Sequence, residues 1–293
     1  MANPVYGGQA VMEGVMMRGG RAVATAVRRP DGEVVIKRQE LQPIARRCPI
    51  LGWPLVRGSV ALVEMLSIGI SALMWSANQA APDEQELTKK DMVLSVVLSF
   101  GLATVIFILA PTLVAGWLQR QIPVGFWLNL LEGLMRVGLF VGYIAIIARL
   151  EDIQRFFAYH GAEHKTVNAL EAGEELTVER VRRYPVLHPR CGTAFMLYVM
   201  VIAIAFFSFF GWPVWWMRLV IRLAALPFIA GLAYEITRLA GASCSPWVKS
   251  ALAPGLALQR LTTREPDDSM LEVAIAALKT VRDMQKTEGA HHA

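Results

Sequence analysis

The chain has 293 residues, of which 55% are hydrophobic and 18% charged, and its formal net charge is +5. Soluble domains usually carry about a quarter charged residues, so this deficit argues against an ordinary soluble protein and favours a membrane protein. The three cysteines, Cys48, Cys191 and Cys244, are widely spaced. This spacing is not typical of a disulfide framework and fits reduced thiols facing the cytosol better.

Residues 1–50 are expected to form a cytoplasmic region with a Gly-rich segment and a β-hairpin. The runs 22–28 and 33–39 are rich in strand-forming residues, and the Arg-Pro-Asp-Gly sequence between them predicts a turn. No cleavable signal peptide is expected, because charged residues interrupt the position where its apolar region would lie.

The segment 7–20 holds several glycines, which predict sharp turns and close approaches of the backbone. It is not a phosphate-binding P-loop, because no Gly-Lys-Ser/Thr follows, and no strand precedes it as a dinucleotide site requires. Gln9, Glu13 and Arg18 are candidates to complete a functional site if this segment folds over one. The alternative, that they only pack there, stays open.

Residues 51–90 are expected to contain an interfacial or re-entrant helix and a linker. The stretch 58–77 is apolar apart from Glu64 and is just long enough to cross a bilayer. A crossing here would place the basic N-terminus outside, against the positive-inside rule. We therefore favour a helix at the membrane interface, with a crossing as the alternative.

The predicted fold is mainly α-helical, with about four transmembrane helices in two hairpins. A hydrocarbon core of about 30 Å needs roughly 20 helical residues. Turns near Pro123 and Pro213 divide each hairpin, because proline cannot continue a helix. The first hairpin occupies 91–149 and the second 194–240. The four predicted helices are 92–119, 125–149, 194–211 and 214–240.

Basic residues set the predicted orientation. The turn at 120–124 holds only Arg120 and the turn at 211–213 holds none, whereas the segment 150–193 holds six basic residues. Because cytoplasmic loops of membrane proteins are enriched in Lys and Arg, both termini and the segment 150–193 are expected on the cytoplasmic side.

Charged residues also occur within the predicted spans. Glu132 and Arg136 have the i, i+4 spacing that brings opposite charges together on a helix, and Arg218 and Arg222 share a face of the last helix. Since ions inside a membrane normally find partners, Glu132 is expected to pair with Arg136, Arg222 or both. A structural ion pair is the favoured interpretation, and a pathway for ions or substrate is the alternative.

The tail, 241–293, is expected to be cytoplasmic and to end in an amphipathic helix. Ser269 and Glu272 have the spacing of a capping box, and an apolar stripe follows. We expect this stripe to dock against the other cytoplasmic elements, while His291 and His292 receive no role. The stripe consists of Leu271, Ala274, Ile275, Leu278 and Val281.

The segment 150–193 carries the residues most suited to chemistry. His160 and His164, four residues apart on a helix, would place two imidazoles on one face, where they could bind one metal ion. Glu163 lies between them and is the predicted general base. The order of residues is the H-x-x-E-H pattern of the inverted zinc peptidases. Their third ligand, a distant glutamate, has no identifiable equivalent here.

Two further ligand candidates, His188 and Cys191, precede the third predicted span. His188 with the first two histidines would make a three-nitrogen catalytic zinc site, and Cys191 as a fourth ligand would favour a structural site. Cys191 could instead be a nucleophile with a histidine as its base. In the plainest alternative, the histidines only hydrogen-bond neighbouring carboxylates such as Glu171.

Three separated blocks of the sequence resemble the YqhQ-like family of bacterial membrane proteins. They are Gly8–Arg18, Tyr159–Lys165 and His188–Thr193, and the phrase Gln259–Pro266 fits as well. The resemblance implies a multi-pass protein of the bacterial cytoplasmic (inner) membrane, described as a predicted metal-dependent enzyme.

The leading hypothesis is therefore a metal-dependent membrane enzyme. It is expected to be hydrolytic, with zinc as its metal and its site at the cytoplasmic face. One alternative is a membrane-protein biogenesis factor that docks to a ribosome or translocon through salt-sensitive contacts. A transporter is a further alternative, suggested by the two similar hairpins. No sequence-specific nucleic-acid binding is expected, and oligomeric state is not predicted. The basic residues behind the docking alternative are Arg28, Arg29, Lys37, Arg38, Arg46 and Arg47.

Overall fold

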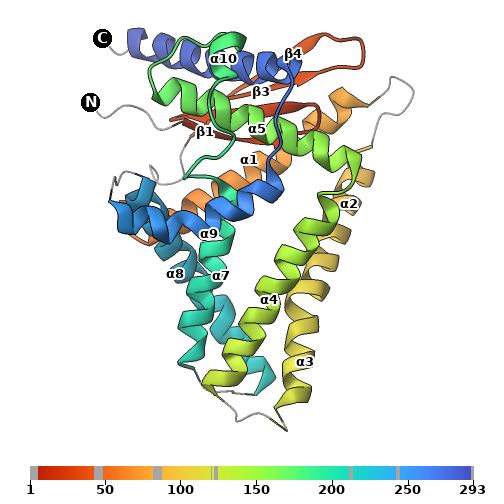
Figure 1. Ribbon diagram of the computed structural model, residues 1–293, viewed down its shortest axis with the longest axis vertical. Coiled ribbons are helices and arrows are strands. Elements are labelled where there is room, and N and C mark those ends of the chain that lie inside the picture. Colours follow the sequence, from red (N-terminus) through yellow and green to blue (C-terminus); the bar gives the residue numbers. More distant parts are fainter. Residues whose placement is uncertain are drawn as a thin grey trace.

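The computed structural model describes residues 6–42, 49–81, 88–119, 121, 125–210, 214–241 and 245–291. It confirms a mainly helical fold with an N-terminal four-stranded antiparallel sheet. Figure 1 shows the sheet and two helices at one end of the molecule, with long helices extending away from them. The described ends of the chain lie near the sheet.

The strands are β1 (Tyr6–Val11), β2 (Gly14–Gly19), β3 (Ala22–Arg28) and β4 (Val34–Glu40). The helices are α1 (Val56–Ala80), α2 (Lys89–Thr104), α3 (Ala110–Leu118), α4 (Phe126–Ile147), α5 (Glu151–Glu171), α6 (Val178–Val181), α7 (Gly192–Ser208), α8 (Trp215–Gly241), α9 (Pro246–Thr262) and α10 (Asp268–His291). A π-helical turn at Val105–Leu109 joins α2 to α3.

The sheet is a meander in the order β1-β2-β3-β4, and the predicted hairpin is its β3–β4 half. The Gly-rich segment forms the other half, β1–β2, and its turn holds Glu13 at a positive φ of 50°. Both faces of the sheet are covered. Met17 packs with α5 and α10 on one face, and Met16 packs toward α1 on the other.

The tail helix α10 packs against β2 and β3, as the amphipathic pattern predicts. Its N-terminus differs from the predicted capping box. The carboxylate of Asp267 accepts a hydrogen bond of 2.9 Å from the Met270 N–H, and the helix begins at Asp268. Asp267 therefore satisfies a terminal N–H group in the way expected of Ser269.

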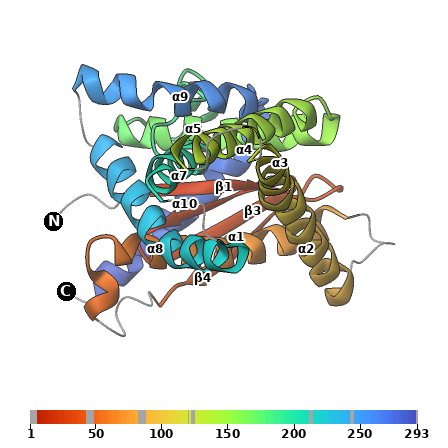
Figure 2. The ribbon, with the colours of Figure 1, turned by 90° about the horizontal axis from the view of Figure 1, so that it is seen from below.

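Helix α1 lies between the sheet and α8 (Figures 1 and 2). The Arg57 guanidinium binds the Glu235 carboxylate at 2.6 Å, which ties α1 to α8. Gly231 allows the two backbones to approach, because a Cβ there would overlap the Leu55 carbonyl oxygen. Close contact at small residues is typical of membrane helices.

Within the described residues, four helices are long and apolar enough to cross a membrane by length and composition: Val56–Ala80, Lys90–Leu118, Phe126–Ile147 and Trp216–Leu239. Three of them match predicted spans. The fourth is α1, which we expected at the interface and which also lies along the sheet. The predicted span 194–211 is the 17-residue α7, which ends at Ser208 and is about 25 Å long.

The ends of both hairpins that lie away from the sheet meet at the lower end in Figure 1. Several predicted features lie outside the described residues. These are Arg120 and Pro123 of the first turn, Pro213 of the second turn, Cys48, Cys244, Arg46, Arg47 and His292.

The predicted intramembrane pairing of Glu132 occurs with both arginines. The Glu132 carboxylate lies 2.5 Å from a nitrogen of Arg136 and 2.5 Å from a nitrogen of Arg222. The Thr112 hydroxyl donates a third hydrogen bond of 2.7 Å. Because these residues come from α3, α4 and α8, one buried carboxylate holds three helices together.

We predict that Gly231→Ala lowers the stability of the folded protein by about 1–3 kcal/mol, because the added methyl group would force α1 and α8 apart. Thermal unfolding of the detergent-purified protein measures this. Gly138→Ala in α4 is the matched control, since nothing lies near a Cβ at Gly138 and its unfolding temperature should not fall. Equal effects of the two substitutions would contradict the tight crossing.

Candidate metal centre

Helix α5 presents the two histidines from one face. Glu151 and Asp152 occupy its first turn, where negative charge favours a helix N-terminus. His160 and His164 follow one turn apart, and their ring centroids are 4.4 Å apart. The predicted helix and the predicted proximity of the two imidazoles are both present.

Backbone carbonyls from two other segments fix the orientation of both rings. His160 Nδ1 lies 2.8 Å from the Thr262 carbonyl oxygen, at the end of α9. His164 Nδ1 lies 2.6 Å from the Val186 carbonyl oxygen, in the segment before α7. A carbonyl can only accept, so each Nδ1 carries the proton and each Nε2 keeps a lone pair. Metal-binding histidines are commonly held in this way.

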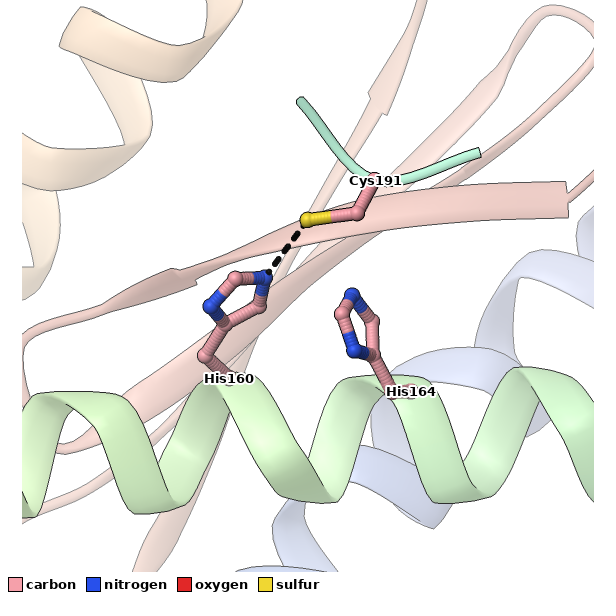
Figure 3. A group of neighbouring side chains, drawn as sticks. All are labelled: His160, His164 and Cys191. Carbon is pink, nitrogen blue, oxygen red and sulfur yellow. Dashed lines mark hydrogen bonds between the residues drawn. The ribbon is translucent and has the colours of Figure 1, made fainter. Parts of the chain in front are cut away.

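Cys191 completes the group. Its buried Sγ lies 3.3 Å from His160 Nε2, and one ligand atom from each of His160, His164 and Cys191 falls within 4.8 Å of the others. Figure 3 shows the thiol above the two rings, and Cys191 directly precedes α7. Two imidazole nitrogens and one sulfur could therefore hold one metal ion, with a fourth position left for another ligand.

Burial lowers the pKa of His164 below its usual value, although its contacts with Cys191 and Val186 oppose this effect. His164 is therefore kept neutral at physiological pH. A neutral imidazole is the form that binds a metal ion.

His188 lies beside this group, with its ring centroid 5.7 Å from that of His164. Its Nε2 is 3.5 Å from a carboxylate oxygen of Glu171, and its Nδ1 accepts a hydrogen bond from the Arg190 N–H. The structure thus groups Cys191, rather than His188, with the two histidines of α5. His188 is directed toward Glu171, as the plainest alternative supposed for the histidines.

Gln259 of α9 holds the backbone of His188 in place. The His188 N–H donates to Gln259 Oε1 at 2.9 Å, and Gln259 Nε2 donates to the His188 carbonyl at 2.8 Å. Gln259 is fully buried, so these two bonds satisfy polar groups that water does not reach.

Glu163 is buried on the side of α5 that meets β1. Its Cγ would lie 3.3 Å from a Cβ built at Gly8, so the backbone of β1 approaches it closely. Burial raises the pKa of Glu163, and the nearby His160 and His188 oppose this rise. A raised pKa makes a carboxylate a stronger base, which favours a role as general base.

The three residues proposed to complete the site bind elsewhere. Gln9 donates to the Gly69 carbonyl of α1 at 3.1 Å, and Arg18 binds Glu64 at 3.3 Å. The Glu13 carboxylate forms a bidentate ion pair with Arg155, at 2.5 Å for each contact. These side chains join the sheet to α1 and α5.

Several residues that shape the centre were not singled out from the sequence. Thr262 and Val186 act through their backbone carbonyls, and Gln259 acts through its side-chain amide. Gly161 lets the segment between α9 and α10 reach α5, because a Cβ there would overlap the Arg264 carbonyl oxygen. The glycine within the His160–His164 pattern was the available signal for this approach.

The fold and the site define a class: a multi-pass membrane protein that carries a sheet module with a His/His/Cys group able to hold a metal ion. The chain belongs to the family described as "Protein of unknown function (DUF1385)", which matches residues 53–284. It is 35% identical over 291 residues to "Uncharacterized protein YqhQ" of Bacillus subtilis (strain 168), covering 93% of this chain and 90% of that protein. This match confirms the resemblance inferred from the motifs. No solved structure matches.

We predict that Gln259→Met lowers stability by about 1–3 kcal/mol, because the N–H and carbonyl of His188 would remain buried without partners. Thermal unfolding in detergent is the measurement. Gln154→Met, at an exposed position of α5, is the matched control and should unfold at the wild-type temperature. If Gln259→Met unfolds there too, the two hydrogen bonds contribute nothing to stability.

Proposed function

We propose that this protein is a metal-dependent membrane enzyme of hydrolytic type, with Zn²⁺ held by His160, His164 and Cys191. The observation that carries the proposal is that two imidazole lone pairs, each fixed by a backbone carbonyl, converge near one buried thiol. In both histidines the Nδ1 atom binds a backbone carbonyl, which leaves Nε2 to face the other ligands. Packing alone does not require this arrangement, whereas metal binding does.

The donor set favours zinc over the harder divalent ions. Thiolate and imidazole ligands suit zinc, whereas magnesium and calcium prefer oxygen. When bound, Zn²⁺ supplies Lewis-acid chemistry at a position that the three protein ligands leave open. The proposed ligand set differs from the predicted three-histidine site only in that Cys191 takes the place of His188.

Glu163 is the proposed general base. It belongs to the same helix as the two histidine ligands, and burial raises its pKa, which makes it a stronger base than an exposed carboxylate. Gly8 lets β1 approach this residue, since a Cβ built there would lie 3.3 Å from the Glu163 Cγ. The Gly-rich segment thus reaches Glu163 through its backbone.

We further propose that the sheet end of the molecule faces the cytoplasm of a bacterial cell. Six basic residues lie between 150 and 193, and these residues belong to the end of the molecule that carries the sheet. The bacterial relative supports a bacterial inner membrane as the location.

A biogenesis factor docking to a ribosome or translocon is less well supported. That alternative depends on basic residues of the sheet, and two of these have partners within the chain. Arg28 binds Glu272 at 2.9 Å, and Arg29 binds the Gln79 side chain at 2.6 Å. We therefore favour the enzyme, and docking and transport stay predictions of the sequence alone.

The proposal predicts about one zinc per chain in detergent-purified wild-type protein, measured by elemental analysis. His160→Ala/His164→Ala and Cys191→Ser should each lose this zinc, because each removes ligands of the proposed site. His188→Ala is the matched control and should retain it. Wild-type protein without zinc, or equal loss from His188→Ala, would overturn the assignment.

Glu163→Gln is predicted to retain the zinc of the wild type, since Glu163 lies outside the ligand group. With any substrate that the wild-type enzyme hydrolyses, the variant should lose about 10²–10⁴-fold in rate, because glutamine cannot accept a proton. Elemental analysis and a hydrolysis assay on the same preparation separate the two effects. Unchanged hydrolysis would remove Glu163 as the base.

A further inference from the structure

The ion cluster of α3, α4 and α8 lies far from the candidate metal centre, at the opposite end of the molecule (Figure 1). Glu132 at its centre is 1% exposed. The side chains of Arg136 and Arg222 are 22% and 18% exposed, so both guanidinium groups remain partly open to their surroundings. A partner could reach the arginines, while Glu132 is enclosed.

The sequence at the start of α3 helps to orient Arg136 in this cluster. Pro111 has no N–H and cannot donate to the carbonyl of Phe107, four residues earlier. Arg136 Nε donates to that carbonyl at 3.2 Å, and Arg136 also donates to the Thr112 hydroxyl at 3.1 Å. The π-helical turn before Pro111 thus supplies a fixed acceptor that orients Arg136 toward Glu132.

The cluster has more positive than negative charge. Arg136 and Arg222 both bind the single carboxylate of Glu132, so these three residues carry a net charge of +1. The N-termini of α4 and α8 lie at this end and add positive potential. Unbalanced charge within a membrane is costly, so an anion at this point would be strongly favoured.

Aromatic side chains place the cluster close to the lipid headgroups. Trp117, Trp127 and Trp216 are exposed near the end of the helices that lies away from the sheet. Tryptophan is enriched at the level of the headgroups. Thr112 lies five residues from Trp117, and Glu132 lies five residues from Trp127. Five residues correspond to about 7.5 Å along a helix. Helical side chains lean toward the N-terminus, so Arg136 and Arg222 extend toward that level.

Apolar residues beside the cluster would suit acyl chains. Leu113 is 73% exposed next to Thr112, and Leu223 is 60% exposed next to Arg222. A free inorganic anion would gain nothing from contact with these apolar side chains. A lipid would contact them with its tails while its phosphate met the arginines.

We propose that Arg136 and Arg222, oriented by Glu132 and Thr112, bind the phosphate of an anionic phospholipid in the leaflet away from the sheet. The guanidinium group suits phosphate because it presents several N–H donors in one plane. Glu132 fixes the two arginines side by side and leaves the rest of their charge for the lipid. This lipid site does not depend on the proposed enzymatic function.

The test is native mass spectrometry of the full-length protein in detergent, with phosphatidylglycerol and phosphatidylcholine of equal chain length. Wild-type protein should retain one phosphatidylglycerol in preference to phosphatidylcholine. Arg222→Gln should lose this preference by tenfold or more. Arg222→Lys keeps a cation beside Glu132 but lacks the planar set of N–H donors, so it should weaken the preference and tests the site even where Arg222→Gln does not fold.

Arg57→Gln is the matched control, because it breaks an Arg–Glu pair at the opposite end of α8 and should leave the preference unchanged. Adding inorganic phosphate separates a lipid from a free anion. Displacement of phosphatidylglycerol by inorganic phosphate at equal concentration would assign the site to free phosphate and overturn the proposal. No preference in the wild type, or equal losses from Arg57→Gln and Arg222→Gln, would overturn it as well.

Discussion

Two hydrogen bonds from ring nitrogens of α5 to backbone carbonyls hold the candidate metal centre together. The Thr262 carbonyl terminates α9 and the Val186 carbonyl precedes α7, so His160 and His164 connect α5 to two distant parts of the chain. The same bonds leave both Nε2 atoms without a proton and directed toward Cys191. Helix packing and ligand orientation therefore depend on the same contacts, and neither can be changed alone.

The sheet positions α5 for these contacts. Its central strands, β2 and β3, are buried on both faces, with α5 and α10 on one side and α1 on the other. This double burial explains why β2 was not recognised from the sequence. A strand with one wet face alternates polar and apolar residues, whereas Val15, Met16 and Met17 run consecutively inside a Gly-rich segment. The β3–β4 hairpin was predictable because its turn residues carry a local signal.

In the candidate metal centre, too, some features follow from local sequence and others from long-range contacts. The i, i+4 spacing of His160 and His164 predicts their proximity, because helix geometry alone fixes it. His188 and Cys191 are only three residues apart, and the sequence favoured both as ligands. The choice between them depends on Gln259, which holds the backbone of His188 from 71 positions along the chain. No local pattern carries that information.

Glu132 and Arg136 were predictable for the reason that applies to the histidines, whereas the role of Thr112 follows from tertiary packing.

The construction of the centre links it to the membrane. Cys191 directly precedes α7, and Thr262 is the last residue of α9, so the thiol and one of the two fixing carbonyls lie at the ends of two helices that pack against each other. The two histidines come from α5, which packs on the sheet itself. The centre therefore forms only where the sheet module meets the helical bundle. Any displacement of α7 or α9 relative to α5 would change the separation between Cys191 and His160. The segment 150–193, removed from the bundle, would keep both histidines and the cysteine but lose the carbonyl that orients His160. The geometry of the candidate site therefore depends on the positions of α7 and α9, because the backbone at the ends of these helices carries Cys191 and the Thr262 carbonyl.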